Sequence, residues 1–210
     1  MFENSKLSRY KVRKLIECFC IDIDATKSSL LLKLNRKTVN RYFLAFRRLI
    51  HARRIADKAQ AGLAGADEGV DGRVKLPGSP KLPVFGIYVR DGALYTELVS
   101  GPPAKSLRAL IKGKVSPEDI VRSEDWRGYD GLVDAGNDKC LRIGKTEKSA
   151  KIDAIEAFWS FAKRRLAKFN GTNLNFGLHL KECEWRYNRT LPQLLADIHR
   201  LIADEKDLMV

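Results

Sequence analysis

Two runs rich in β-branched and aromatic residues, 82–90 and 93–99, are separated only by Asp91-Gly92. An Asp-Gly pair between two such runs predicts a β-hairpin, because these residues readily adopt the positive φ angles of a two-residue turn. In 7–56, and again from Ala150 onward, the pattern changes, and apolar residues recur every three or four positions as in amphipathic helices. The sequence therefore predicts an α/β fold and excludes an all-helical or all-β chain.

Shorter signals predict the remaining elements around the hairpin. In chain order we expect a weak strand at 63–70, a helix at 104–112, a strand at 119–122 and, after the segment 126–133, a strand at 139–143. A long amphipathic helix begins near Ala150 and ends before Gly171, and helical stretches follow at 174–188 and 192–204. Strands, a helix, a strand and then helices predict a mixed sheet flanked by helices.

The first 56 residues predict an all-helical module. Three short helices are expected, at 8–21, at 25–32 and from Arg36 to Ala56, and Asp24 and Asn35 are suitable N-caps for the second and third. The third helix should turn inward the apolar residues that recur at helical spacing, which are Val39, Tyr42 or Phe43, Phe46 and Ile50.

Positive charge is concentrated in this module. The chain has a formal net charge of +13, and residues 1–62 hold fifteen Lys/Arg and five Asp/Glu, which places +10 of that charge there. A polyanion is the expected partner, because each phosphate that the protein neutralises releases condensed counterions. A tight turn followed by a helix that opens with Arg-Lys-Thr-x-Asn-Arg is typical of a DNA-binding helix-turn-helix. The alternative is an ordinary three-helix bundle with a solvated basic face.

The candidate DNA-binding residues carry cationic or hydrogen-bonding side chains on two helices. Lys and Arg would hold phosphates, whereas Thr38 and Asn40 could reach base edges. The candidates on the recognition helix are Arg36, Lys37, Thr38, Asn40, Arg41, Arg47 and Arg48. A second basic cluster, expected on the long C-terminal helix opposite or beside its apolar stripe, comprises Lys163, Arg164, Arg165 and Lys168.

Acidic residues stand at three places from which they could converge at one end of a sheet. Asp67 lies on the first expected strand, Glu124 and Asp125 follow the fourth, and Asp153 and Glu156 open the long helix. Converged carboxylates bind Mg²⁺ or Mn²⁺, and two such ions support in-line phosphodiester chemistry. Because the chain has 26 acidic residues, the alternative for each of these is a solvated surface charge.

Four stretches carry motifs that extend these expectations. They are Ala66-Asp-Glu68, Ser123-Glu-Asp-Trp-Arg-Gly-Tyr-Asp-Gly-Leu132, the helix that begins Asp153-Ala-Ile-Glu-Ala-Phe-Trp-Ser160, and Leu178-His-Leu-Lys-Glu-Cys-Glu-Trp-Arg-Tyr-Asn188. In these motifs the chain resembles the insertion-sequence transposases of the IS1595 superfamily, in its ISXO2-like, IS1016 branch. There the first two stretches hold metal ligands, the third is the final catalytic helix with its (Asn/Glu)-x-x-Glu-x-Phe-Trp-Ser pattern, and the fourth follows it.

This resemblance implies an RNase H-like fold over about residues 62–210 and a DD(E/N) active site. Asp67, Glu124 and Asp153 are the implied metal ligands, and Asp125 and Glu156 are further catalytic candidates. The implied chemistry is strand cleavage by water, followed by attack of the freed 3′-hydroxyl on target DNA. The implied partners are double-stranded DNA, both inverted repeats and target, and further copies of the chain in a dimer or larger assembly.

The chain departs from the family pattern at its expected ligands. The family's second Asp falls two residues before the Trp, where this chain has Glu124, and Asp125 is displaced by one position. Asp153 replaces the usual Asn or Glu, and Lys151 replaces a His. A catalytically decayed or repurposed copy that only binds DNA, for example as a regulator, is therefore an alternative, as is a nuclease or resolvase that cuts without joining.

These expectations divide the chain into three parts. Residues 1–56 form the helix-turn-helix module, 57–82 a linker with the first catalytic strand and a loop, and 83–210 the remainder of the catalytic domain. No apolar run approaches the ~20 residues that cross a bilayer, and no signal peptide is recognisable, so a cytoplasmic, nucleoid-associated protein is expected. Cys18 and Cys20, within an apolar helix, are expected to be buried thiols.

Overall fold

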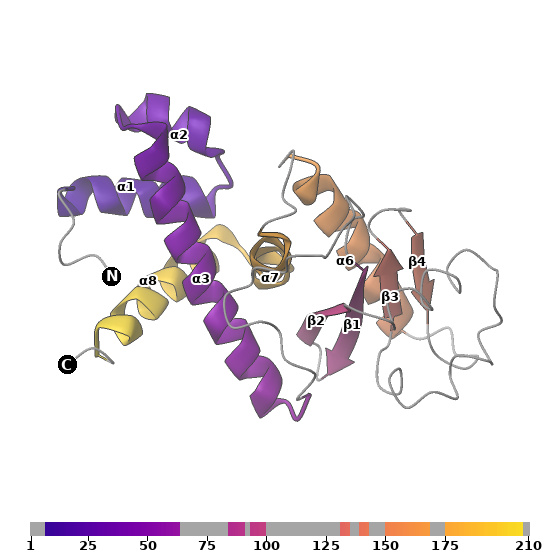
Figure 1. Ribbon diagram of the computed structural model, residues 1–210. Coiled ribbons are helices and arrows are strands. Elements are labelled where there is room, and N and C mark those ends of the chain that lie inside the picture. The colour runs from indigo at the N-terminus through magenta and orange to yellow at the C-terminus, as the bar shows by residue number, and fades with distance from the viewer. Residues whose placement is uncertain are drawn as a thin grey trace. The chain divides into compact units, whose positions relative to one another are not determined.

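The computed structural model describes residues 7–63, 84–90, 93–99, 131–134, 139–142, 150–168 and 175–207. The chain forms two compact units (Figure 1): Met1–Ala56 with Asn188–Val210, and Asp57–Tyr187. The helix expected at 104–112 and the strand expected at 119–122 lie outside the described residues, as does nearly all of the strand expected at 63–70.

The first unit is built from α1 (Arg9–Cys20), α2 (Ala25–Leu32), the first part of α3 (Arg36–Gln60) and α8 (Leu191–Asp207). The first three agree closely with the helices expected from the sequence. Local hydrogen bonds explain their starts, because the Asp24 carboxylate accepts from the main-chain N–H of Lys27 at 2.9 Å and the Ser8 hydroxyl from that of Lys11 at 3.4 Å. Each of these side chains satisfies an N–H group that has no partner within its helix.

Aromatic side chains make up much of the core of this unit. The ring of Phe19 on α1 lies 5.3 Å from both Phe43 and Phe46 on α3, in edge-to-face contacts. The apolar stripe expected on α3 is buried, and both alternatives at its second position, Tyr42 and Phe43, face inward. The helical spacing therefore predicted this core correctly.

The C-terminal helix α8 belongs to the first unit, whereas the sequence-based division assigned residues 83–210 to the catalytic domain. α8 lies against α1, beside which it runs in Figure 1, and its apolar face is buried through Leu194, Ile198 and Leu201. The spacing of these residues indicates an amphipathic helix but does not identify the surface that the helix covers.

The second unit contains a four-stranded sheet with the order β2-β1-β3-β4. The strands are β1 (Val84–Arg90), β2 (Ala93–Val99), β3 (Gly131–Asp134) and β4 (Lys139–Arg142). β1 and β2 form the expected hairpin, whose register ends with Arg90 opposite Ala93. All the pairings between described strands are antiparallel, so the parallel pairing of the expected mixed sheet is not found in this part of the chain.

Two helices complete this unit. α6 (Ala150–Leu166) contacts β1 and β4, and α7 (Phe176–Arg186) contacts α6 and β2. α6 buries Ile155, Phe158, Trp159 and Ala162 in a core shared with the hairpin. Full burial of a large apolar side chain contributes about 1.5–3 kcal/mol, so this stripe is a main source of the unit's stability. The described chain is mostly helical with helices packed on a sheet, in accord with the α/β class.

Within the described ranges, no helix is both long enough and apolar enough to cross a membrane.

Candidate functional site

The turn between α2 and α3 presents the start of α3 to solvent. Lys33 ends α2 in the left-handed region with a φ of 49°, and the N–H of Leu34 donates to the carbonyl of Ser29 at 3.0 Å. Asn35 then caps α3, because its side-chain oxygen accepts from the N–H of Lys37 at 2.8 Å. Three residues thus connect α2 to α3, and α3 begins at Arg36, as expected from the sequence.

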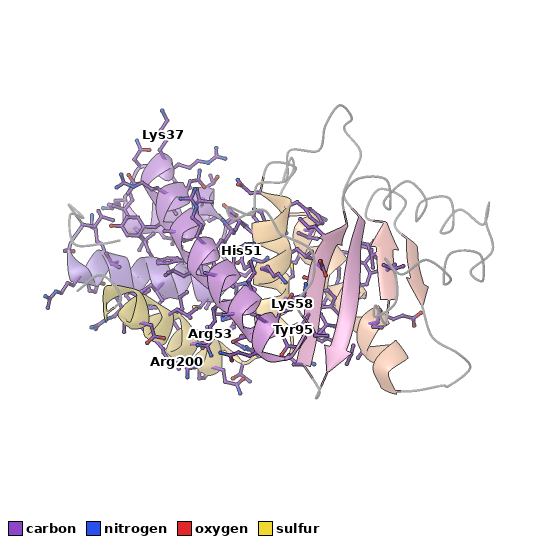
Figure 2. The ribbon with its side chains drawn as sticks, turned by 60° about the horizontal axis from the view of Figure 1, so that its bottom comes forward. Lys37, His51, Arg53, Lys58, Tyr95 and Arg200 are labelled. Atoms are coloured by element: carbon purple, nitrogen blue, oxygen red, sulfur yellow. The ribbon has the colours of Figure 1, made fainter. Side chains whose placement is uncertain are left out.

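The first turns of α3 are strongly positive. Arg36, Lys37, Asn40 and Arg41 are exposed and Thr38 is half-buried. The first turn has no acidic residue, and the positive end of the helix dipole adds to the charge of its cations. Figure 2 shows Lys37 at the free end of the helix, pointing away from the other helices of its unit. Cations together with amide and hydroxyl groups at a helix start suit both phosphate and base contacts.

Two further candidates on α3 are less available to a partner. Arg47 and Arg48 are half-buried, and the guanidinium of Arg47 lies 5.6 Å from the centre of the Phe19 ring. This distance is within the range of a cation–π contact, so Arg47 helps to pack α3 on α1. The exposed cationic surface expected along α3 is therefore densest over its first two turns.

The basic cluster in the last turn of α6 and just after it is exposed at three of its four positions. Lys163, Arg164 and Lys168 are exposed, whereas Arg165 is 4% exposed and forms an ion pair with Glu182 at 2.5 Å. The assignment of Arg165 to a DNA-facing surface was wrong. Arg165 follows Phe158 by seven residues, which is about two helical turns, so both side chains lie on the inward face.

Of the five acidic candidates, the structure describes one in full and the backbone of a second. Asp67, Glu124 and Asp125 lie outside the described residues, and for Asp153 the structure describes the backbone of α6 but not the side chain. Glu156 is exposed on α6, one turn after Asp153. Among the residues that the structure describes, no three His, Cys, Asp or Glu side chains gather as a metal site. The convergence of the carboxylates stays a prediction, and their hard oxygen donors suit Mg²⁺ or Mn²⁺.

Sequence reasoning did not anticipate a set of buried charged side chains in the second unit. Lys58 pairs with Glu97 at 2.8 Å, with both side chains less than a tenth exposed. On α7, Lys181, Glu182, Glu184 and Arg186 are all buried, and each is hydrogen-bonded. The only sequence signal was the alternation of charged and apolar residues in 178–188, which does not distinguish a buried network from a solvated helix.

Three cysteines, Cys18, Cys20 and Cys183, are buried free thiols. Cys18 and Cys20 lie in the core of α1, as expected, and Cys183 lies in the core beneath α6. Burial raises the pKa of the Cys183 thiol to about 11, although the guanidinium of Arg165 lies 3.6 Å from its sulfur. These thiols are therefore structural rather than reactive.

Comparison with known proteins shows similarity to transposases. Residues 35–188 match the family of ISXO2-like transposase domains, a span that begins at the cap of α3 and ends just after α7. An uncharacterized transposase-like protein of Haemophilus influenzae is 38% identical over 102 residues, which cover 46% of this chain and 82% of the relative. No solved structure matches this chain.

Proposed function

This chain belongs to the family of ISXO2-like transposases, and we propose that it binds the ends of an insertion sequence and catalyses metal-dependent DNA cleavage and strand transfer there. The observation that carries the proposal is the exposed, cationic start of α3 in a chain of this family.

In this proposal α2 and α3 act as a helix-turn-helix on double-stranded DNA. Arg36, Lys37 and Arg41 contact phosphates, and Asn40 and Thr38 read base edges in the major groove. A capped helix with a short turn before it holds these side chains on a rigid support, which suits recognition of one sequence. Lys163 and Arg164 on α6, and Lys168 just after it, bind the backbone of DNA near the catalytic residues.

The proposed catalytic domain is RNase H-like, with Asp67, Glu124 and Asp153 as metal ligands. Asp125 and Glu156 are the substitutes one residue and one helical turn away. Two bound divalent ions would supply activation of the attacking oxygen and stabilisation of the leaving oxygen. The proposed ligands would hold the phosphodiester in line with the attacking oxygen. Small errors in the placement of these ligands would therefore lower the rate of cleavage strongly. Because an insertion sequence has two ends, we further propose that two or more copies of the chain assemble on its DNA.

The DNA-binding part of the proposal is tested with a matched pair of arginines on α3. Arg41 and Arg53 are both exposed and are twelve positions apart, which corresponds to about 18 Å along the helix. Arg41→Ala is expected to weaken binding to DNA from the element's ends and to reduce the slope of log affinity against log salt by about 0.9. Arg53→Ala is the control and should leave both quantities unchanged. Equal effects of the two substitutions would contradict the assignment.

A strand-transfer assay on pre-cut ends separates the proposal from its alternatives. Joining of a 3′-hydroxyl end to target DNA is the expected result. Cleavage without joining would indicate a nuclease or resolvase, and DNA binding with neither reaction would indicate a repurposed or decayed copy that acts as a regulator.

A further inference from the structure

The segment 178–188 resembles a family motif, but the proposed DNA contacts and metal ligands leave it without a role. In the structure it forms most of α7, and every residue from Phe176 to Arg186 is buried. Buried charged residues are costly unless they are paired, so the charges of α7 must be held by specific partners. These partners lie in two different elements, β2 and α6.

One set of α7 side chains binds the strand β2. Glu184 accepts from both the main-chain N–H and the hydroxyl of Thr96, each at 2.8 Å. Lys181 donates to the carbonyl of Thr96 at 2.5 Å and to Glu184 at 3.2 Å. Among the described strands β2 lies at an edge of the sheet, so these side chains satisfy main-chain groups that a neighbouring strand would otherwise bind. α7 is thereby fixed to the sheet.

The other set binds α6. One oxygen of Glu182 accepts from Arg165 at 2.5 Å and from Arg186 at 2.8 and 2.9 Å. Nearer the start of α6, the Tyr187 hydroxyl donates to the carbonyl of Ala154 at 3.4 Å, and its ring lies 5.3 Å from that of Phe158. Contacts at both ends of α6 therefore determine its position relative to α7.

We propose that α7 is the positioning element of the catalytic helix, and that the ion pair between Arg165 and Glu182 is its main connection to α6. This inference rests on the proposed function, in which α6 carries Asp153 and Glu156. Arg165 lies twelve residues, or about 18 Å, from Asp153 along the helix. A small tilt of α6 at this ion pair displaces the carboxylates at its far end, and metal ligands must be held within about 0.5 Å.

Arg165 and Arg186 both bind the carboxylate of Glu182, and substitution of each in turn separates a positioning role from general stability. Arg165→Met removes the ion pair between the helices and leaves Glu182 paired with Arg186 on its own helix. Arg186→Met removes the other guanidinium and leaves the connection intact. Each variant retains one buried carboxylate with one buried guanidinium, so the electrostatic cost within the core is matched.

Hydrogen exchange measured on the metal-free full chain gives the structural result. Arg165→Met should speed exchange of the amides in α6 by about tenfold relative to Arg186→Met, while exchange in the N-terminal half of α3 stays the same in both variants. Equal exchange rates in α6 for the two variants would overturn the inference. If Arg165→Met does not fold, Arg165→Gln, which also removes the cation, is measured in its place, with the same two outcomes.

Cleavage of end DNA gives the functional result. Arg165→Met should raise the Mg²⁺ concentration for half-maximal cleavage by about tenfold, with metal-free DNA affinity unchanged. Arg186→Met should leave both quantities near the wild-type values, and a parallel rise in both variants would contradict a positioning role. If the wild-type chain cleaves nothing, the proposed function fails, and the exchange rates alone decide whether α7 positions α6.

Discussion

Replacement of Ile198 by alanine tests the packing of the C-terminal helix α8 on the N-terminal helices. Ile198 is fully buried and lies in the middle of the apolar face of α8, which contacts α1. The substitution removes three carbon atoms, which at about 0.8 kcal/mol per buried methylene corresponds to about 2.4 kcal/mol of transfer free energy. The cavity adds to this loss, so the free energy of unfolding of this unit should fall by about 3 kcal/mol.

Urea denaturation followed by far-ultraviolet circular dichroism measures the loss. With a slope near 2 kcal/mol per molar urea, the midpoint of the helical transition should fall by roughly 1.5 M. Ile202→Ala, the same chemical change one turn later at a half-buried position, is the control and should cost less than half as much. Equal midpoints for the two variants would refute the packing of α8 in the core of this unit.

Three further predictions concern a helix cap, a buried ion pair and a buried thiol. Asp24→Ala should destabilise the chain by about 1 kcal/mol through loss of the α2 cap. The hydrogen bond from the Lys27 N–H lowers the pKa of Asp24 below its ordinary value of 3.8, so thermal melts should show the difference above about pH 4 and its loss as the pH falls further. Lys58→Met should cost about 3–5 kcal/mol in urea because it removes a cation that pairs with the buried Glu97 carboxylate, and Glu97→Leu added to it should restore stability; no restoration would argue against the pair. Because burial raises the pKa of Cys183 to about 11, mass spectrometry should find this thiol unalkylated by iodoacetamide at pH 8 in the native chain and alkylated in urea, whereas rapid native labelling would contradict its burial.

The N-terminal helices could be predicted from the sequence because their signals are local. The apolar positions of α3 recur at helical spacing, and Asn35 and Asp24 cap the helices at the expected places. The hairpin was predicted for the same reason, since an Asp-Gly pair between two β-rich runs favours a two-residue turn, and β1 pairs with β2 as expected. The exposed start of α3 followed directly from these local patterns.

The features that the sequence did not predict depend on contacts between residues far apart in the chain. Arg165 belongs to a run of cations that is typical of a solvated surface. It is nevertheless buried, because it pairs with Glu182 on another helix. The attachment of α8 to α1 and the antiparallel pairing of β1 with β3 are also long-range. Periodicity shows which face of an element is apolar, but it does not show which other element covers that face.

The most direct test of the account is nicking of DNA that carries the inverted repeats flanking this coding sequence. The proposal predicts nicks at the repeat ends that require Mg²⁺ or Mn²⁺ and disappear in Asp67→Ala, whose affinity for the same DNA in metal-free buffer stays at the wild-type value. Nicking by Asp67→Ala at the wild-type rate, or no metal-dependent nicking by a wild-type chain that binds the repeats, would contradict the assignment of this chain as an active transposase.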